Sequence, residues 1–372
     1  MKEFIFDRLV NKENICNLEK EKTLLMKLAL NKENVVVYAP RNYGKTSLIK
    51  KVIIPEYRDK TKNPFVVFVD LMGVTSLASI SSRLQLSIEK ELSTVSTGKS
   101  VWENLKGVFG SFNPNIEMDM QGNTSISFNI NTEIPKKTFN TLFGSLGELS
   151  KKYDVLLILD EFQDITFVEE SEALFRESFQ QLNIPIILLG SKKHLLQNIF
   201  IDSNKPLSNW GKDVVIPPIK YETYHAYIQE RFKQKKLSIT LDESIYLQDK
   251  LNRIPENINI ICNELLENNK GIDICRVQIE TAIKDILFYR QGRFEEFMKT
   301  LSDVEEQILI RIAKEGCVSS PQSKQFVSKT TVTPRTISKT ISKLTDDGMV
   351  DITKEGYVVS DVLLRLYLEA FR

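Results

Sequence analysis

The sequence has 372 residues, two to three times the length of a typical domain, and therefore favours two or three domains. Hydrophobic residues make up 42% of it and charged residues 27%, with 50 Lys and Arg against 49 Asp and Glu. Such a composition excludes a disordered chain and a uniformly basic nucleic-acid coat protein. Because the formal net charge is +1, any basic surface must be local.

The cysteines, histidines and apolar runs indicate the redox state of the thiols and the location of the protein. The four cysteines, which form no C-x-x-C pair, are Cys16, Cys262, Cys275 and Cys317, and the chain has two histidines. We expect reduced thiols and neither a disulfide framework nor a structural zinc site. Residues 1–14 include Asp and Glu without a continuous apolar region, and the longest apolar runs are too short to span a bilayer. These features favour a soluble, cytoplasmic protein.

Short β-branched runs alternate with helical patterns in the first half of the chain. The predicted strands are 35–38, 65–69, 155–159 and 184–189. Each run is continuous in its apolar character, as expected of strands that are buried on both faces of a sheet. The pattern predicts an α/β domain, residues 1–218, in which helices cover a parallel sheet.

An insertion at about residues 112–134 interrupts this alternation. Apolar and polar residues alternate on both sides of Gln121-Gly122-Asn123, and the apolar ones are Ile116, Met118, Met120, Ile126, Phe128 and Ile130. The pattern predicts an amphipathic hairpin. Its apolar face either packs on the domain or on the segment around Trp102 and Phe109, or binds a protein partner.

Strands give way to four helical patterns from about Tyr221. Pro255 stands at a first-turn position of one of them, and Gly271 follows its end. We expect a small all-helical lid domain over residues 219–293.

The remaining residues, 294–372, have the element order of a winged helix-turn-helix. Ser302 and Glu305 form a capping box at the start of one helix. A short helical stretch follows, and Thr333 and Pro334 then open another helix. Two short strands complete the predicted domain.

A phosphate-binding loop follows the first strand and opens a helix that Pro55 is expected to end. In such a loop backbone N–H groups face an anion, a lysine adds charge to the outer phosphates, and a Ser or Thr hydroxyl binds magnesium. Lys45 and Thr46 fill the last two roles, and Gly44 lets the backbone approach closely. Ala39 stands where the motif has its first glycine. The predicted nucleotide-binding residues of the loop are Ala39, Pro40, Arg41, Asn42, Tyr43, Gly44, Lys45, Thr46 and Ser47.

Acidic and polar residues follow the next strands. Asp160 ends the third predicted strand, where magnesium needs an oxygen ligand, so Thr46 and Asp160 are the predicted metal ligands. Glu161 is placed to orient or deprotonate the water that attacks the γ-phosphate. Ser191, after the fourth strand, is predicted to lie beside that phosphate. Lys45, Glu161 and Ser191 are thus the predicted catalytic residues.

Four strings of the sequence resemble the archaeal-type ATPases of the AAA+/STAND group, which are also widespread in bacteria. They lie at 39–47, 159–163 (Leu-Asp-Glu-Phe-Gln), 189–191 (Leu-Gly-Ser) and 360–368. The resemblance covers nearly the whole chain, and the Asp-Glu-Phe-Gln string is its most specific element. It implies a P-loop core of the ASCE class, a helical lid and a winged helix, with ATP and Mg²⁺ as ligands.

The chain departs from the family pattern at several positions. Asn17-Leu18-Glu19 stands for a Gly-Arg-Glu signature, and Gly211-Lys212 for a Gly-Arg. Lysine keeps the charge but lacks the planar fork that grips a phosphate twice. Arg253-Ile254-Pro255 stands where the family has a Gly-x-Pro near the adenine. The resemblance implies that Lys212 and Pro255 contact nucleotide, while Arg253 is either a second sensor or an exposed helix-end arginine.

Basic residues are concentrated in the predicted winged helix. The stretch 319–345 contains five of them and no acid. Arg335, Lys339 and Lys343 recur every fourth residue on one face of the helix that Pro334 opens. Such a face is typical of a recognition helix that contacts double-stranded DNA. The alternative is a solvated lysine face on a winged helix used for protein contacts or autoinhibition.

Together the motifs predict an ATP-dependent switch. ATP with Mg²⁺, bound between core and lid, sets how the DNA-binding winged helix is presented, and slow hydrolysis resets it. A second hypothesis is a DNA-binding or protein-interaction module with a degenerate nucleotide site. A third is a sensor in a defence or stress system, with the hairpin as its partner surface. Oligomers are compatible with all three.

Overall fold

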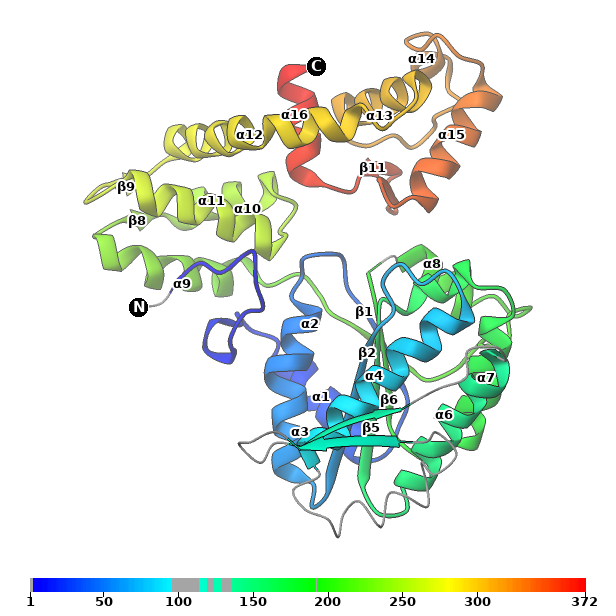
Figure 1. Ribbon diagram of the computed structural model, residues 1–372. Helices are drawn as coiled ribbons and strands as arrows, with labels where there is room; N and C mark the ends of the chain where they lie inside the picture. Colours follow the sequence, from blue (N-terminus) through cyan, green and yellow to red (C-terminus); the bar gives the residue numbers. More distant parts are fainter. Residues whose placement is uncertain (1–2, 96–113, 119–123, 129–134, 192) are drawn as a thin grey trace. The chain divides into compact units, whose positions relative to one another are not determined.

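The computed structural model describes residues 3–95, 114–118, 124–128, 135–191 and 193–372 (Figure 1). The chain divides into two compact units. Leu9–Pro217 form one unit, and Pro218–Arg372 form the other together with the N-terminal segment up to Arg8. The division into three domains stays a prediction.

A parallel sheet forms the centre of the first unit. Among the described residues it has five strands in the order β2-β5-β6-β1-β7. The strands are β1 (Val35–Tyr38), β2 (Pro64–Asp70), β5 (Asp154–Asp160), β6 (Ile186–Gly190) and β7 (Lys212–Val215). The four predicted strands and their parallel pairing are confirmed. Sequence patterns missed β7 because it is a short edge strand in which Val214 is buried and its neighbours are exposed.

Helices flank this sheet, and no described helix is long and apolar enough to cross a membrane. One buried cluster joins side chains of β1, β2, β5 and β6 to α4, α6, α7, α8 and η4. The helical elements of the unit are η1 (Lys12–Asn14), α1 (Glu19–Leu30), α2 (Lys45–Leu48), η2 (Ile49–Ile53), α3 (Ile54–Lys60), α4 (Leu77–Val95), α6 (Pro135–Leu149), η4 (Phe162–Phe167), α7 (Ser171–Gln181) and α8 (Lys193–Phe200).

The helix after the phosphate-binding loop does not end at Pro55, contrary to the sequence-based expectation. It continues through Pro55 as α3 to Lys60. A π-helical turn, η2, ends at Ile53, two residues before the proline. The wider turn changes the hydrogen-bond register, so the missing N–H and the pyrrolidine ring are tolerated.

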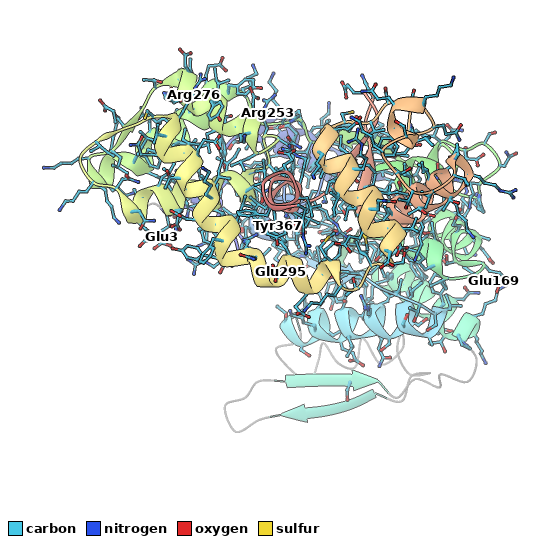
Figure 2. All side chains as sticks on the ribbon, turned by 90° about the horizontal axis from the view of Figure 1, so that it is seen from above. Glu3, Glu169, Arg253, Arg276, Glu295 and Tyr367 are labelled. Carbon is cyan, nitrogen blue, oxygen red and sulfur yellow. The ribbon has the colours of Figure 1, made fainter. Side chains whose placement is uncertain are left out.

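The predicted insertion contains an antiparallel hairpin of β3 (Pro114–Met118) and β4 (Thr124–Phe128), with Ile116 opposite Ile126. β4 lies beside α4 (Figure 2). Met120, Ile130, the turn at 121–123 and the segment around Trp102 and Phe109 lie outside the described residues. The hairpin is therefore confirmed, and a partner role for its apolar face stays a prediction.

The second unit begins with helices, as predicted. Its first elements are α9 (Tyr221–Phe232), η5 (Lys233–Lys235), β8 (Ser238–Ile239), α10 (Leu241–Lys250), α11 (Pro255–Asn268), β9 (Asp273–Ile274) and α12 (Arg276–Met298). β8 and β9 form a short parallel ladder that the sequence patterns did not indicate. The predicted boundary between lid and winged helix, 293/294, falls inside α12.

The N-terminal segment belongs to this second unit because two buried side chains hold its backbone. Arg231 is 1% exposed, and its Nε donates to the Glu3 carbonyl at 3.0 Å. Asn259 Nδ2 donates to the Ile5 carbonyl at 2.7 Å. Phe4, which lies between Glu3 and Ile5 in the sequence, is buried.

The last elements form the predicted winged helix, α13 (Asp303–Glu315), α14 (Lys324–Val327), α15 (Pro334–Asp346), β10 (Val350–Ile352), β11 (Tyr357–Val359) and α16 (Val362–Phe371). The capping box of Ser302 and Glu305 and the Thr333 cap are both present. β10 and β11 pair antiparallel. Gly356 is required in their turn, because a Cβ there would lie 2.4 Å from the Val318 carbonyl oxygen.

Candidate functional site

The phosphate-binding loop lies where the parallel strands end. β1 ends at Tyr38, in register with Gly190 at the end of β6, and β5 runs beside β6. Residues that follow these strands therefore share one edge of the sheet. Asn42 (φ 64°) and Gly44 (φ 81°) take left-handed conformations that turn the loop into α2. In the described part of the chain nothing lies within 4 Å of the place a Gly44 Cβ would occupy, so the loop opens to free space there.

Lys45 is the buried cation of this loop, with 6% of its surface exposed. Its Nζ donates to the carbonyl oxygens of Ala39 at 3.2 Å and Pro40 at 3.4 Å. Burial lowers the pKa of Lys45, and the carboxylates of Glu161 and Asp160 oppose that shift. An ammonium group held against neutral carbonyls beside an open loop is poised to bind an anion.

Thr46 and Asp160 come together as predicted, although 114 residues separate them. The Thr46 hydroxyl donates to Asp160 Oδ2 at 2.8 Å. Asp160 is 4% exposed, and burial raises the pKa of its carboxyl while the Thr46 hydrogen bond lowers it. A hydroxyl and a carboxylate are oxygen ligands of the kind that Mg²⁺ prefers, so this pair fits the predicted metal role.

Glu161 lies at a left-handed turn (φ 50°) between β5 and η4. Ser191 Oγ donates to Glu161 Oε2 at 2.8 Å, so the two predicted catalytic side chains are in contact. Gln163 Nε2 donates to the same oxygen at 2.6 Å. Gln163 had no role in the sequence-based site, and the signal that could have found it is a polar residue inside the buried run of η4.

The remaining loop residues differ in exposure. Pro40, Arg41 and Asn42 are exposed, whereas Ala39, Tyr43 and Ser47 are buried. The Ser47 hydroxyl accepts the backbone N–H of Val10 at 3.1 Å, which ties the segment before α1 to the loop helix. Their roles in binding nucleotide stay predictions.

Asn17 and Leu18, where the family has Gly-Arg, both take left-handed conformations, with φ of 64° and 75°. Asparagine is among the residues that adopt this conformation most readily after glycine. Leu18 is buried before α1 and supplies no donor for a phosphate.

Lys212 does not join the site. The predicted contact between Lys212 and nucleotide is therefore wrong. It begins β7 opposite Val35, whereas Val215 lies opposite Tyr38. Because the strands are parallel, Lys212 lies about 10 Å along the strand from the edge that carries the loop. Its ammonium group pairs there with Glu33. Without β7 as a recognised strand, the sequence offered no means of telling which end of the sheet Lys212 occupies.

Pro255 and Arg253 lie in the second unit. Pro255 occupies the first turn of α11, as predicted. The Arg253 guanidinium lies 4.1 Å from the centre of the Tyr221 ring, and Nη2 donates to the Ile219 carbonyl. Arg253 is thus engaged within its own unit, and nucleotide contact by Pro255 stays a prediction.

The predicted recognition helix, α15, has the expected two faces. Ile337, Ile341 and Leu344 are buried, whereas Arg335, Lys339 and Lys343 are exposed. Lys343 forms an ion pair with Glu305 of α13. This pair and the Ser302 hydrogen bonds lower the pKa of Glu305 to about 2. Arg335 and Lys339 are therefore the better placed cations for a phosphate backbone.

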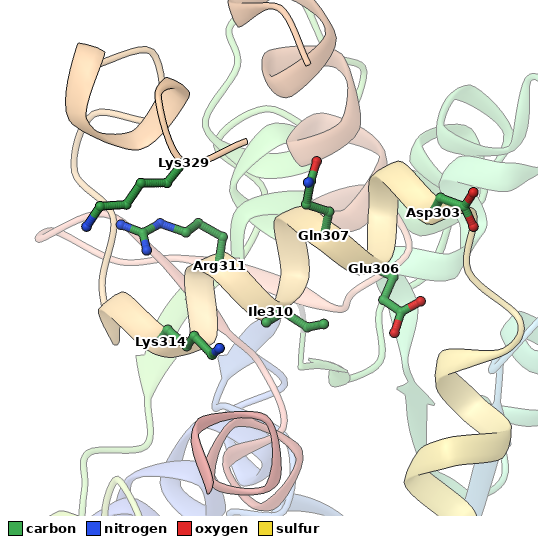
Figure 3. A pocket seen from close by; sticks show the side chains of 7 residues that line it. All are labelled: Asp303, Glu306, Gln307, Ile310, Arg311, Lys314 and Lys329. Carbon is green, nitrogen blue, oxygen red and sulfur yellow. The ribbon is translucent and has the colours of Figure 1, made fainter. Parts of the chain in front are cut away.

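A groove of about 460 Å³ lies on another side of the winged helix (Figure 3). Acidic side chains lie at one end of the α13 face and basic ones at the other. The lining residues are Asp303, Glu306, Gln307, Ile310, Arg311, Lys314 and Lys329. Lys329, one of the five basic residues of the acid-free stretch, thus lies with Arg311 and Lys314 in a groove that no residue of α15 lines.

Comparison with known proteins identifies the fold. A Walker-type ATPase of Pyrococcus abyssi is similar with 17% identity and a TM-score of 0.64, over 98% of this chain and 99% of that one. The ORC1 protein of Aeropyrum pernix, solved in complex with DNA, is similar with 13% identity and a TM-score of 0.52, over 100% of this chain and 98% of that one. The ORC2 protein of the same organism, in ADPNP–ADP complexes, has 13% identity and a TM-score of 0.52, over 98% and 99%.

A family model adds to this for the C-terminal part. Residues 292–370 match the family described as a probable winged helix domain. No curated protein matches the chain. The chain thus shares the fold of these solved structures, an α/β unit with a P-loop-like strand order followed by a helical region and a C-terminal winged helix.

Proposed function

We propose that this protein binds ATP with Mg²⁺ and hydrolyses it slowly. One observation carries most weight. Side chains from the loop, from the end of β5 and from the end of β6 meet at one edge of the sheet, through Thr46 to Asp160 and Ser191 to Glu161. The contacts join segments that are far apart in sequence, and each of these side chains has a stated role in phosphoryl chemistry.

The residues present fit the nucleotide and its metal. Lys45 would place its charge against the outer phosphates, and the backbone N–H groups of the loop would face them. Thr46 and Asp160 would hold Mg²⁺, which supplies positive charge to neutralise the phosphates. Ala39 in place of a glycine and the loss of Lys212 from the site are the reasons to expect slow turnover.

Glu161 is the proposed base for the attacking water. Ser191 and Gln163 both donate hydrogen bonds to its Oε2 and hold the carboxylate in one orientation. A carboxylate held in this way orients a water without first being reorganised.

The test is equilibrium ATP binding and phosphate release by the parent and by Lys45→Ala. We expect micromolar to millimolar ATP affinity for the parent and loss of binding in the variant, because a buried charge facing the phosphates is removed. A parent that binds no ATP would favour the alternative, a DNA-binding or protein-interaction module with a degenerate nucleotide site.

A second function, DNA binding by the winged helix, is supported by α15. Its outer face presents Arg335 and Lys339 to solvent, and a protein of similar fold was solved in complex with DNA. We expect the parent to bind duplex DNA in a salt-dependent manner, and the double substitution of Arg335 and Lys339 by alanine to weaken that binding. Weak binding that the double variant leaves unchanged would remove the DNA role.

We further propose that nucleotide acts as a switch on DNA affinity. Such a switch requires ATP to favour one arrangement of the molecule over another. DNA affinity measured with a non-hydrolysable ATP analogue, with ADP and without nucleotide should differ among the three conditions. Equal affinities would leave an ATPase and a DNA-binding domain that act independently, and a sensor function would then depend on a partner of the hairpin.

A further inference from the structure

Gln163 is a deeply buried polar side chain next to the proposed catalytic glutamate. Only 1% of its surface is exposed, and it lies in η4 between the fully buried Phe162 and the buried Asp164. A carboxamide in such a place is costly unless its donors are satisfied. Its hydrogen-bond partners therefore indicate what it does.

Both partners of its amide nitrogen are carboxylates. Gln163 Nε2 donates to Glu161 Oε2 at 2.6 Å and to Asp164 Oδ1 at 3.1 Å. A primary amide offers two N–H donors on one nitrogen and carries no charge, so it can join two carboxylates without itself titrating. The same geometry assigns the nitrogen and oxygen of the carboxamide, since an oxygen in that position would face two acceptors.

Asp164 is anchored in turn. Its Oδ2 accepts the backbone N–H of Gly73 at 2.7 Å, in the loop that follows β2. The neighbouring Leu71 N–H donates to the Asp160 carbonyl at 2.9 Å, so this loop is fastened to the end of β5. Gln163 thus reaches Glu161 from a support that is fixed to two strands.

Gly190 makes room for the other side of the carboxamide. A Cβ at this position would lie 2.4 Å from Gln163 Oε1 and 2.4 Å from Leu196 Cδ1. Oε1 is buried and, within the described part of the chain, accepts no hydrogen bond. The carboxamide is therefore oriented by its nitrogen alone, and the glycine before Ser191 is needed for that orientation.

We propose that Gln163 is a positioning residue that sets the orientation of the Glu161 carboxylate for attack on ATP by water. It acts together with Ser191, which donates to the same oxygen from the end of the neighbouring strand β6, and Asp164 keeps the Gln163 amide in place. This role rests on the proposed ATPase function. It also assigns a role to Gln163, the last residue of the Asp-Glu-Phe-Gln string.

The test compares Gln163→Met with the parent. Methionine matches the length of glutamine but has no N–H donor. Gln248→Met is the matched control, because Gln248 is also 1% exposed and donates through Nε2 to Ser244 Oγ and the Tyr221 carbonyl, in the second unit. For Gln163→Met we expect kcat to fall at least about tenfold with ATP affinity and KM within about threefold of the parent, since a misplaced base slows only the chemical step.

A purely structural role would give a different result. In that case Gln163→Met and Gln248→Met would lower the unfolding temperature and the hydrolysis rate together, and ATP affinity would fall with kcat. An unchanged kcat would likewise overturn the positioning role. If Gln163→Met does not fold, Gln163→Leu, which also lacks the N–H donors and adds no charge between the two carboxylates, replaces it, and the same split between kcat and affinity is expected.

A double-variant cycle with Ser191→Ala provides the second measurement. Because Gln163 and Ser191 both donate to Glu161 Oε2, we expect the effects of the two substitutions on the activation free energy, measured from kcat, to be non-additive. Effects that multiply independently would overturn a shared action through Glu161. No ATP turnover by the parent would overturn the proposed function itself, whereas parent turnover that Gln163→Met leaves intact overturns only the positioning role.

Discussion

The phosphate-loop edge of the sheet and the outer face of α15 present charge in opposite ways. At the sheet edge, Lys45 and Asp160 are 6% and 4% exposed, and their partners are other polar groups of the same cluster. On α15, Arg335 and Lys339 extend into solvent. The first region pairs its charged groups with other polar groups, whereas the second exposes them to solvent.

This difference explains why the two regions support function to different degrees. Taking polar and charged groups out of water costs free energy that close pairing only partly recovers, so a buried cluster of this kind is informative about chemistry. Exposed cations on a helix cost little and occur on many surfaces. The proposed ATPase function therefore rests on geometry, while the proposed DNA function needs the winged-helix fold as additional support.

The largest expected effect is at the buried site. Glu161→Gln keeps the shape of the side chain but removes the negative charge that accepts a proton from water. We expect ATP hydrolysis to fall by about 10²–10⁴-fold, as for loss of a general base. Phosphate release and equilibrium ATP binding measure the two quantities separately, and ATP affinity should stay close to that of the parent. A matching loss of affinity would mean that Glu161 holds nucleotide instead.

Gly190→Ala tests how tightly the same region is packed. The added methyl group would meet Gln163 Oε1 and Leu196 at 2.4 Å, so we expect the free energy of unfolding to fall by ~1–3 kcal/mol. Thermal or denaturant unfolding measures it. Gly144→Ala in α6 is the matched control, because nothing among the described residues lies within 4 Å of its Cβ and alanine favours a helix. A Gly190→Ala protein as stable as this control would show that the site is loosely packed.

On the exposed region, single substitutions should act through salt dependence. Arg335→Ala and Lys339→Ala are each expected to reduce the slope of log affinity for duplex DNA against log salt by about 0.9, the value for one phosphate contact. Lys343→Ala should change it less, because Lys343 pairs with Glu305. Titrations at several salt concentrations measure the slopes. A larger effect from Lys343 would place the DNA-contacting face elsewhere on the winged helix.

The smallest effect concerns that ion pair itself. The pKa of Glu305, about 2, lies below its ordinary value of 4.5, so its ionised form stabilises the folded state above about pH 4.5 and the contribution is lost as pH falls toward 2. Glu305→Gln retains a side chain that can cap α13 but loses the charge. We expect a small loss of stability at neutral pH that disappears on acidification through this range, measured by denaturant unfolding at each pH. A difference that persists at low pH would assign the effect to capping.

Continuous apolar runs and local capping signals predicted much of the fold. The strands at 35–38 and 155–159 are buried on both faces, so their composition alone identifies them. The caps at Ser302 and Thr333 depend on residues three positions apart, a distance that a sequence shows directly. In contrast, β7 has one buried residue, and its place at the sheet edge depends on β1.

The sequence by itself determined the chemistry available at the site, because a G-K-T after a strand and Asp-Glu at the end of another specify the groups a nucleotide needs. Tertiary structure alone decided which groups meet. The parallel register places Ser191 against Glu161 and leaves Lys212 at the far end of its strand. It also brings Gln163, Asp164 and Gly73 into one hydrogen-bonded series. Such contacts depend on the pairing of distant strands, and no local pattern of residues records that pairing.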